Sequence, residues 1–422
     1  MKETLTHGEI VTFLLQLAVI LGAARLFAEF ARVLKQPAVV GEILAGVLLG
    51  PTLLGWVAPE VSATLFPESG HLAIVLDGFI EASVVLLLFI AGLEVDLQIV
   101  YKQGIQAVIV SLSSLIVPFA LGFVITYMFP EMLGLIGDAD PLVFALFIGT
   151  TLSITALPVI ARILMDLNVF RTQMGMLIIA SAMIIDILGW LIFTVILSLM
   201  DPSDSGGHGQ VGRTIGLTLG FTVFALTIGK FIINKILPWI NSRLAWPGGV
   251  LSISIVVCLI SAAFTEYIGI HAIFGAFIMG IAIGDSPHMT ERAKEILHQF
   301  INNIFAPIFF VSIGLFVSFF DNFNFALVAI LLALALVGKT SGAFFGARKS
   351  GLSRNQSLAV GFGMNTHGTL EVILAAVALS AGLIDEKVYV AILTMVIITI
   401  IISAPLMRYW LERDKESSKS KT

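Results

Sequence analysis

Two ionisable residues lie in the middle of long apolar segments. Asp186 belongs to Ser181-Ala-Met-Ile-Ile-Asp-Ile-Leu-Gly-Trp190, and Lys339 belongs to Leu336-Val-Gly-Lys-Thr-Ser-Gly342. A charge at the centre of a membrane helix costs about 2.5–3.5 kcal/mol on insertion scales, so it indicates a partner, a wet cavity or a function. The pattern predicts a carboxylate that binds a proton or a cation, with a lysine near it. The alternative is a purely structural Asp186–Lys339 ion pair.

Two apolar segments also contain residues that interrupt a helix. Residues 149–158 read Gly-Thr-Thr-Leu-Ser-Ile-Thr-Ala-Leu-Pro, and residues 361–369 read Gly-Phe-Gly-Met-Asn-Thr-His-Gly-Thr. Pro158 removes a backbone donor, and unwound backbone at bilayer depth is tolerated only where it lines a cavity or is buried in protein. We expect the hydroxyls of Thr151, Ser153 and Thr155, with freed carbonyls, to replace water around a cation. The second break is predicted at Asn365, Thr366, His367 and Gly368. The alternative is a pair of ordinary kinks.

Glu371 follows the second break, where the N-terminus of a half-helix would stabilise an anion; the alternative role is a structural helix cap. His367 stands alone, and a single histidine makes no metal site. The motifs GxSxG, GxxxxGK[ST] and HExxH are absent from the sequence. We therefore predict neither an enzyme nor a resident cofactor.

Composition places these residues in a membrane. The 422 residues are 58% hydrophobic and 12% charged, against about 25% charged in a soluble domain. A net charge of −5 argues against nucleic acid as a partner. Apolar runs recur along the chain and predict an all-α polytopic protein with about thirteen transmembrane helices. The predicted spans are 9–30, 38–57, 72–92, 105–128, 141–164, 174–200, 214–234, 248–268, 269–284, 300–320, 324–346, 356–381 and 388–408.

The distribution of the 23 lysines and arginines gives the orientation. Most of them fall on one side if the N-terminus is outside and the C-terminus cytoplasmic, as the positive-inside rule requires for a multi-pass protein of the inner (cell) membrane. The transmembrane domain is predicted at 1–410. A short, charged cytosolic tail is predicted at 411–422, disordered from residue 413, and residues 201–210 are expected to form an external linker.

The two predicted broken spans, 141–164 and 356–381, cross the membrane in opposite directions. Inverted halves at roughly 9–200 and 248–408, joined by a linker helix at 214–234, would place the breaks at corresponding positions. Paired broken helices of this kind indicate a transporter site.

Five segments carry a family resemblance. They are Gln36-Pro-Ala-Val-Val-Gly-Glu-Ile-Leu-Ala-Gly-Val-Leu-Leu-Gly-Pro51, Leu87-Leu-Phe-Ile-Ala-Gly-Leu-Glu94, Ile184-Ile-Asp-Ile-Leu-Gly-Trp190, Ala306-Pro-Ile-Phe-Phe-Val-Ser-Ile-Gly-Leu315 and Gly361-Phe-Gly-Met-Asn-Thr-His-Gly-Thr-Leu-Glu371. Along nearly its whole length the chain resembles the monovalent cation:proton antiporters of the Kef/NapA type. The resemblance implies a NapA/NhaA-like fold with two crossed discontinuous helices and a homodimer. It makes Asp186 the residue that binds Na⁺ or K⁺ and the proton, and Lys339 the basic residue near that site.

The chain departs from the family pattern in two ways. Many sodium/proton members carry two adjacent aspartates, whereas here the first position is Ile185, so Lys339 needs another partner, either Asp186 or Glu371. Kef-type potassium systems append a cytosolic nucleotide-binding domain. This chain ends at Thr422, so gating by such a domain is expected only from a separate subunit.

The expected function is exchange of a monovalent cation, Na⁺ first and K⁺ second, for protons. One titrating carboxylate gives electroneutral exchange unless Lys339 supplies a second proton. Two alternatives stay open. One is a channel-like K⁺ efflux protein or a Kef-type transporter without its regulatory domain; the channel would show flux without proton coupling. The other is a non-transporting membrane sensor, in which neutral Asp186 variants would keep their function.

Overall fold

The described chain is helical throughout, and its helices form two units. The computed structural model describes residues 5–34, 36, 38–67, 69–135, 137, 140–167, 169–200 and 208–419. The first unit comprises Met1–Val95 and Gly212–Asn322, and the second comprises Asp96–Val211 and Phe323–Thr422. Each unit therefore draws one stretch from each of the two predicted halves. As a result, both predicted broken spans belong to the second unit.

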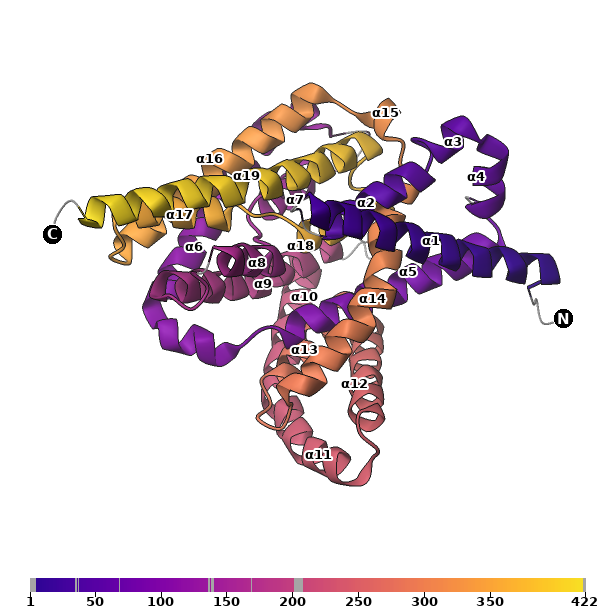
Figure 1. Cartoon of the computed structure of the whole chain (residues 1–422), viewed down its shortest axis with the longest axis horizontal. Helices are drawn as coiled ribbons and strands as arrows, with labels where there is room; N and C mark the ends of the chain where they lie inside the picture. The colour runs from indigo at the N-terminus through magenta and orange to yellow at the C-terminus, as the bar shows by residue number, and fades with distance from the viewer. Residues whose placement is uncertain are drawn as a thin grey trace. The chain divides into compact units, whose positions relative to one another are not determined.

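The first unit holds two runs of helices (Figure 1). The first run is α1 (His7–Val33), α2 (Ala38–Leu49), α3 (Leu54–Val57), α4 (Pro59–Leu65) and α5 (His71–Leu93). The second run starts with α10 (His208–Phe224), whose first residues precede the unit boundary, and continues through the π-helix η2 (Ala225–Gly229), α11 (Lys230–Arg243), α12 (Gly248–Tyr267), α13 (Ala272–Gly284), α14 (Glu291–Leu315) and α15 (Phe319–Asn322).

The second unit also holds two runs. The first is α6 (Leu97–Met128), the 3₁₀ turn η1 (Glu131–Leu133), α7 (Pro141–Thr151), α8 (Leu157–Asp166) and α9 (Gln173–Met200). The second is α16 (Phe325–Lys349), α17 (Arg354–Met364), α18 (Thr369–Ser380) and α19 (Glu386–Lys419). In Figure 1 the long yellow α19 runs beside the orange α16 and α17, which it contacts.

The predicted architecture of an all-helical polytopic membrane protein is confirmed. In the described part of the chain, ten helices are long and apolar enough to cross a membrane. The remaining three predicted spans correspond to shorter helices. These are α13 for 269–284, α7 followed by α8 for 141–164, and α17 followed by α18 for 356–381.

One predicted helix start is confirmed and another is wrong. The helix α6 begins at Leu97, where Asp96 caps it by accepting the backbone N–H of Gln98 at 2.8 Å. Gly104 interrupts α6 with a φ of 55°, a conformation that favours glycine, so the part that follows it begins at residue 105, as predicted. The span predicted from residue 300 is α14, which begins at Glu291.

The expectation of a disordered tail from residue 413 is also wrong for the described residues. The last helix, α19, continues to Lys419. The carboxylate of Asp414 accepts hydrogen bonds from the Ser353 hydroxyl at 2.5 Å and from the Gln356 amide at 2.9 Å. These contacts tie the end of α19 to the first turn of α17. Residues 201–207 of the predicted external linker lie outside the described residues.

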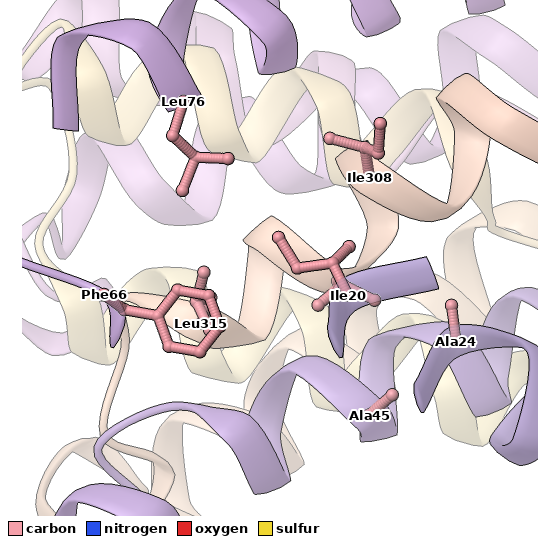
Figure 2. Close-up of a cluster of buried hydrophobic side chains, with 8 residues drawn as sticks. Ile20, Ala24, Ala45, Phe66, Leu76, Ile308 and Leu315 are labelled. Carbon is pink, nitrogen blue, oxygen red and sulfur yellow. The ribbon is translucent and has the colours of Figure 1, made fainter. Parts of the chain in front are cut away.

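The core of the first unit is apolar and closely packed (Figure 2). Its buried side chains are Ile20 and Ala24 of α1, Ala45 of α2, Phe66 after α4, Leu76 of α5, and Ile308, Val311 and Leu315 of α14. Elsewhere in this unit, Gly92 of α5 faces Gly280 of α13, and a methyl group on Gly280 would lie 3.0 Å from the Gly92 Cα. Small residues that let backbones approach are the usual basis of helix association in lipid, where no hydrophobic force drives helices together.

Candidate functional site

Two helices of the second unit are interrupted at mid-span. α7 ends at Thr151 and α8 begins at Leu157, while α17 ends at Met364 and α18 begins at Thr369. Pro158 lies in the first turn of α8, where a proline is tolerated because that N–H has no partner within the helix. The predicted discontinuities are therefore present. Their non-helical residues are 152–156 and 365–368.

The two interruptions cross each other. The backbone N–H of Ala156 donates to the Thr366 carbonyl at 2.8 Å, and the Thr155 hydroxyl donates to the Met364 carbonyl at 3.0 Å. A Cβ on Gly368 would lie 2.6 Å from the Cβ of Ala156, so the chains touch at this glycine. The crossing satisfies part of the backbone that each break leaves without helical partners, as a buried break requires.

Asp186 lies on α9 and is only 4% exposed. One turn further along, Gly189 packs against the break of α7–α8, since a Cβ there would lie 2.8 Å from the Ile154 side chain. The Asp186 carboxylate also acts electrostatically on Lys339. The structure thus places the predicted carboxylate in the same unit as the crossing, on a helix that packs against α7 and α8.

Lys339 reaches the first break from α16. Its side chain is fully buried, and its ammonium donates a hydrogen bond to the backbone carbonyl of Ser153. The preceding residue, Gly338, lets α16 approach α6, because a Cβ there would lie 2.9 Å from the Pro118 Cα. Ser153 follows the C-terminus of α7, and the C-terminal end of a helix carries partial negative charge. The ammonium therefore lies where that charge favours a cation.

The predicted hydroxyl ligands differ in their hydrogen bonding. The Ser153 hydroxyl donates to the Gly149 carbonyl at 2.6 Å, and the Thr155 hydroxyl donates to the Met364 carbonyl at 3.0 Å. Outside this predicted set, the Thr366 hydroxyl donates to the Gly363 carbonyl at 3.0 Å. The buried Thr151 hydroxyl has no hydrogen-bond partner among the described residues. A hydroxyl that donates one bond keeps acceptor lone pairs, so each of these oxygens can still face a cation.

The second break holds three further buried polar side chains. Glu371 accepts the Gly368 N–H through Oε2 at 2.7 Å, and the described residues give its Oε1 no partner. Nδ1 of His367 lies 3.2 Å from the Asn365 carbonyl oxygen. Both amide atoms of the Asn365 side chain lack a hydrogen-bond partner in the described part of the chain. The sequence predicts Asn365 only as a helix breaker. An asparagine inside an apolar span was the signal that could have identified it as a candidate ligand.

The donor set suits a hard monovalent cation. It consists of carboxylate, hydroxyl, amide and carbonyl oxygens, the ligand type that alkali and other hard cations prefer. Among the described residues, no group of three or more His, Cys, Asp or Glu side chains could hold a metal ion. One carboxylate that exchanges a proton for a cation, within a frame of neutral oxygens, is therefore the chemistry that this arrangement supports.

Comparison with known proteins agrees with this geometry. A family model described as "Sodium/hydrogen exchanger, transmembrane" matches residues 17–411. The Na⁺/H⁺ antiporter NhaS4 of Synechocystis is 31% identical, over 94% of this chain and 97% of that protein. The Na⁺/H⁺-K⁺ antiporter GerN of Bacillus cereus is 30% identical, over 97% of this chain and 99% of that protein. The K⁺/H⁺ antiporter 1 of Saccharomyces cerevisiae is 28% identical, over 95% of this chain but 46% of that protein.

A solved structure shares the fold. The sodium proton antiporter MjNhaP1 of Methanocaldococcus jannaschii aligns with a TM-score of 0.70 at 18% identity, covering 96% of this chain and 97% of that one. The family model spans nearly all of the sequence. Two relatives of about the same length, NhaS4 and GerN, match this chain over almost their whole length. The chain therefore belongs to the sodium/hydrogen exchanger family.

Proposed function

We propose that Asp186 carries the cation/proton exchange that characterises this family, by binding a monovalent cation and a proton in alternation. The observation that supports this role is its position, almost fully buried on α9 and one turn before Gly189, which packs against the first of the two interrupted helices. A carboxylate held there cannot keep its charge without a counter-ion. Either a proton or a cation supplies that neutrality, so the two ligands compete for the same oxygens.

The crossing provides the remaining ligands on this proposal. The hydroxyls of Thr151, Ser153 and Thr155 and the carbonyls of residues 152–156 replace the water that a cation loses when it enters. Lys339 and Glu371 act as supporting charges, and the transported ions are the only ligands that the mechanism needs. Exchange follows when the site changes sides only while it is occupied, because an empty, charged carboxylate is too costly to move through the membrane.

Na⁺ is the favoured cation, and K⁺ is the second candidate. Two of the relatives are named as Na⁺/H⁺ antiporters, one of these also for K⁺, and the yeast relative is named as a K⁺/H⁺ antiporter. We also propose a homodimer in the inner membrane with its N-terminus outside and its C-terminus cytoplasmic. The distribution of lysine and arginine between alternate loops supports this orientation.

A proton-flux assay in everted vesicles tests the proposal. Vesicles containing the protein are acidified inside, and Na⁺, K⁺, Li⁺ or choline is added in turn. We expect Na⁺ to release protons at the lowest concentration and choline to release none. Vesicles without the protein serve as the control. Proton release with none of the three alkali cations would reject cation/proton exchange, and cation flux without proton movement would indicate a channel instead.

We also expect the exchange to be electroneutral. Ile185 replaces a second carboxylate, and Asp186 is neutral in both loaded forms, so both crossings carry the same charge. The Na⁺ gradient that balances a fixed pH gradient in proteoliposomes should then not change with an imposed voltage. Each 100 mV acts with about 2.3 kcal/mol on each net charge moved. A balance point that moves with voltage would show that a second proton travels, with Lys339 as its carrier.

A further inference from the structure

Lys339 needs a counter-charge that its hydrogen bond does not provide. The side chain is fully buried on α16, and its ammonium donates to the Ser153 carbonyl. A backbone dipole carries only partial charge, whereas a buried ammonium requires a full opposite charge to be tolerated at this depth. Residue 185, beside Asp186 on α9, is a fully buried isoleucine and cannot supply one.

Two carboxylates act on Lys339 through space, those of Glu371 and Asp186. The effect is mutual, since Lys339 is a charge that acts on Glu371. Lys339 and Glu371 make no direct hydrogen bond with each other among the described residues: Lys339 donates to the Ser153 carbonyl, and Glu371 accepts the Gly368 N–H. Buried charges are screened far less than exposed ones, so they interact effectively without touching.

The crossing holds the two charges in fixed positions. Lys339 is anchored on Ser153 in the first break, and Glu371 is anchored on the N–H of Gly368 in the second. The bond from the Ala156 N–H to the Thr366 carbonyl joins those breaks at 2.8 Å. Each charge also lies at the helix end that favours it: the ammonium at the C-terminus of α7 and the carboxylate at the N-terminus of α18.

Glu371 cannot be explained as a helix cap alone. It is fully buried, and the Gly368 N–H engages only Oε2, which leaves Oε1 without a hydrogen-bond partner in the described structure. A glutamine would cap the same N–H equally well, because the capping box accepts either residue. Capping therefore does not require the negative charge of Glu371. A buried carboxylate at this position is instead suited to balance the charge of a nearby cation.

We propose that Glu371 is the standing counter-charge of Lys339, in place of the carboxylate that Ile185 lacks, and that it keeps the ammonium from competing with cations for Asp186. This inference rests on the proposed function, because it assigns Glu371 a positioning role in the same exchange. With Lys339 balanced by Glu371, the ammonium does not compete with a cation or a proton at Asp186. Without Glu371, Asp186 is the remaining acidic group that acts on Lys339, and a cation has to displace the ammonium.

The test is Glu371→Gln in proteoliposomes, with initial rates measured over a range of Na⁺ concentrations. The substitution keeps the cap and removes the charge. We expect the KM for Na⁺ to rise about tenfold, within the range that coupled neighbouring groups show, with a smaller change in the maximal rate. Because a purely capping glutamate would be replaced without effect, a wild-type KM overturns the proposal.

Two second-site changes distinguish the loss of the counter-charge from damage to the fold. Adding Lys339→Gln to Glu371→Gln removes the unbalanced ammonium, and adding Ile185→Asp instead supplies a carboxylate beside Asp186. We expect each double variant to have a lower KM than Glu371→Gln alone. If neither second change lowers the raised KM of Glu371→Gln, the proposal is overturned. It is also overturned if the effects of Lys339→Gln and Glu371→Gln on the KM simply add in the double variant. The proposed function fails separately, through a wild-type protein that shows no cation-driven proton flux.

Discussion

We expect the replacement of Asp186 by asparagine to abolish cation-driven proton release while the protein still inserts into the membrane. Asparagine has nearly the same size, so the packing of α9 against the first break is kept. Its amide neither takes up a proton nor neutralises a cation, and both half-reactions of the exchange disappear together. The measurement is proton release from everted vesicles at saturating Na⁺, normalised to the amount of protein in the membrane.

The matched control is Asp77→Asn. Asp77 is a carboxylate within a predicted span, but it lies on α5 in the first unit and is exposed. This variant should exchange at nearly the wild-type rate. Near-normal exchange in Asp186→Asn would contradict the mechanism and favour a sensor or a transporter whose carboxylate lies elsewhere.

The second large effect is expected from Gly368→Ala. The φ of Gly368 is −178°, an extended conformation open to any residue, so the effect of the new methyl group is steric. That methyl would lie 2.6 Å from the Ala156 Cβ and 3.1 Å from Val159 Cγ2, which forces the two breaks apart. Since overpacking of this kind costs about 1–3 kcal/mol, we expect the exchange rate to fall about tenfold.

A complementary change makes this prediction specific. Ala156→Gly removes the methyl that Gly368→Ala would strike, so the double variant should regain much of the lost rate. Gly216→Ala is the control, because a Cβ at Gly216 in α10 meets nothing within 4 Å. A wild-type rate in Gly368→Ala, or no recovery in the double variant, would show that close contact at the crossing is not required.

The sequence was sufficient to predict the helical membrane architecture and the positions of both breaks. The clusters of hydroxyls with Pro158 and of Asn365 with Gly368 stand out inside apolar runs, and helices cannot continue easily through them. That the breaks cross was expected only from the family resemblance. Their hydrogen bonds join residues about 210 positions apart, a separation over which local patterns carry no information.

The start of α14 was predicted less well, for a physical reason. Hydropathy detects the part of a helix that lies in lipid, whereas capping and continued backbone bonding decide where the helix begins. Thr290 caps α14, and this helix begins in polar sequence that an apolar window ignores. The hydrogen bond of Lys339 could not be predicted from the sequence, because its acceptor is the backbone carbonyl of Ser153. Every residue type has a backbone carbonyl, so the sequence carries no signal for this contact.

The division of the second unit into two stretches has a consequence for biosynthesis. Residues 96–211 emerge from the ribosome long before 323–422, yet both stretches build one unit. Until the later stretch arrives, the Ala156 N–H has no Thr366 carbonyl, and the Ser153 carbonyl has no Lys339. The first half of the site is thus inserted while some of its backbone N–H and C=O groups lack hydrogen-bond partners. In the bilayer core each such unsatisfied group costs several kcal/mol. Completion of the site is a late, post-insertional event, and nascent chains released before about residue 370 would carry a permanently unfinished membrane core.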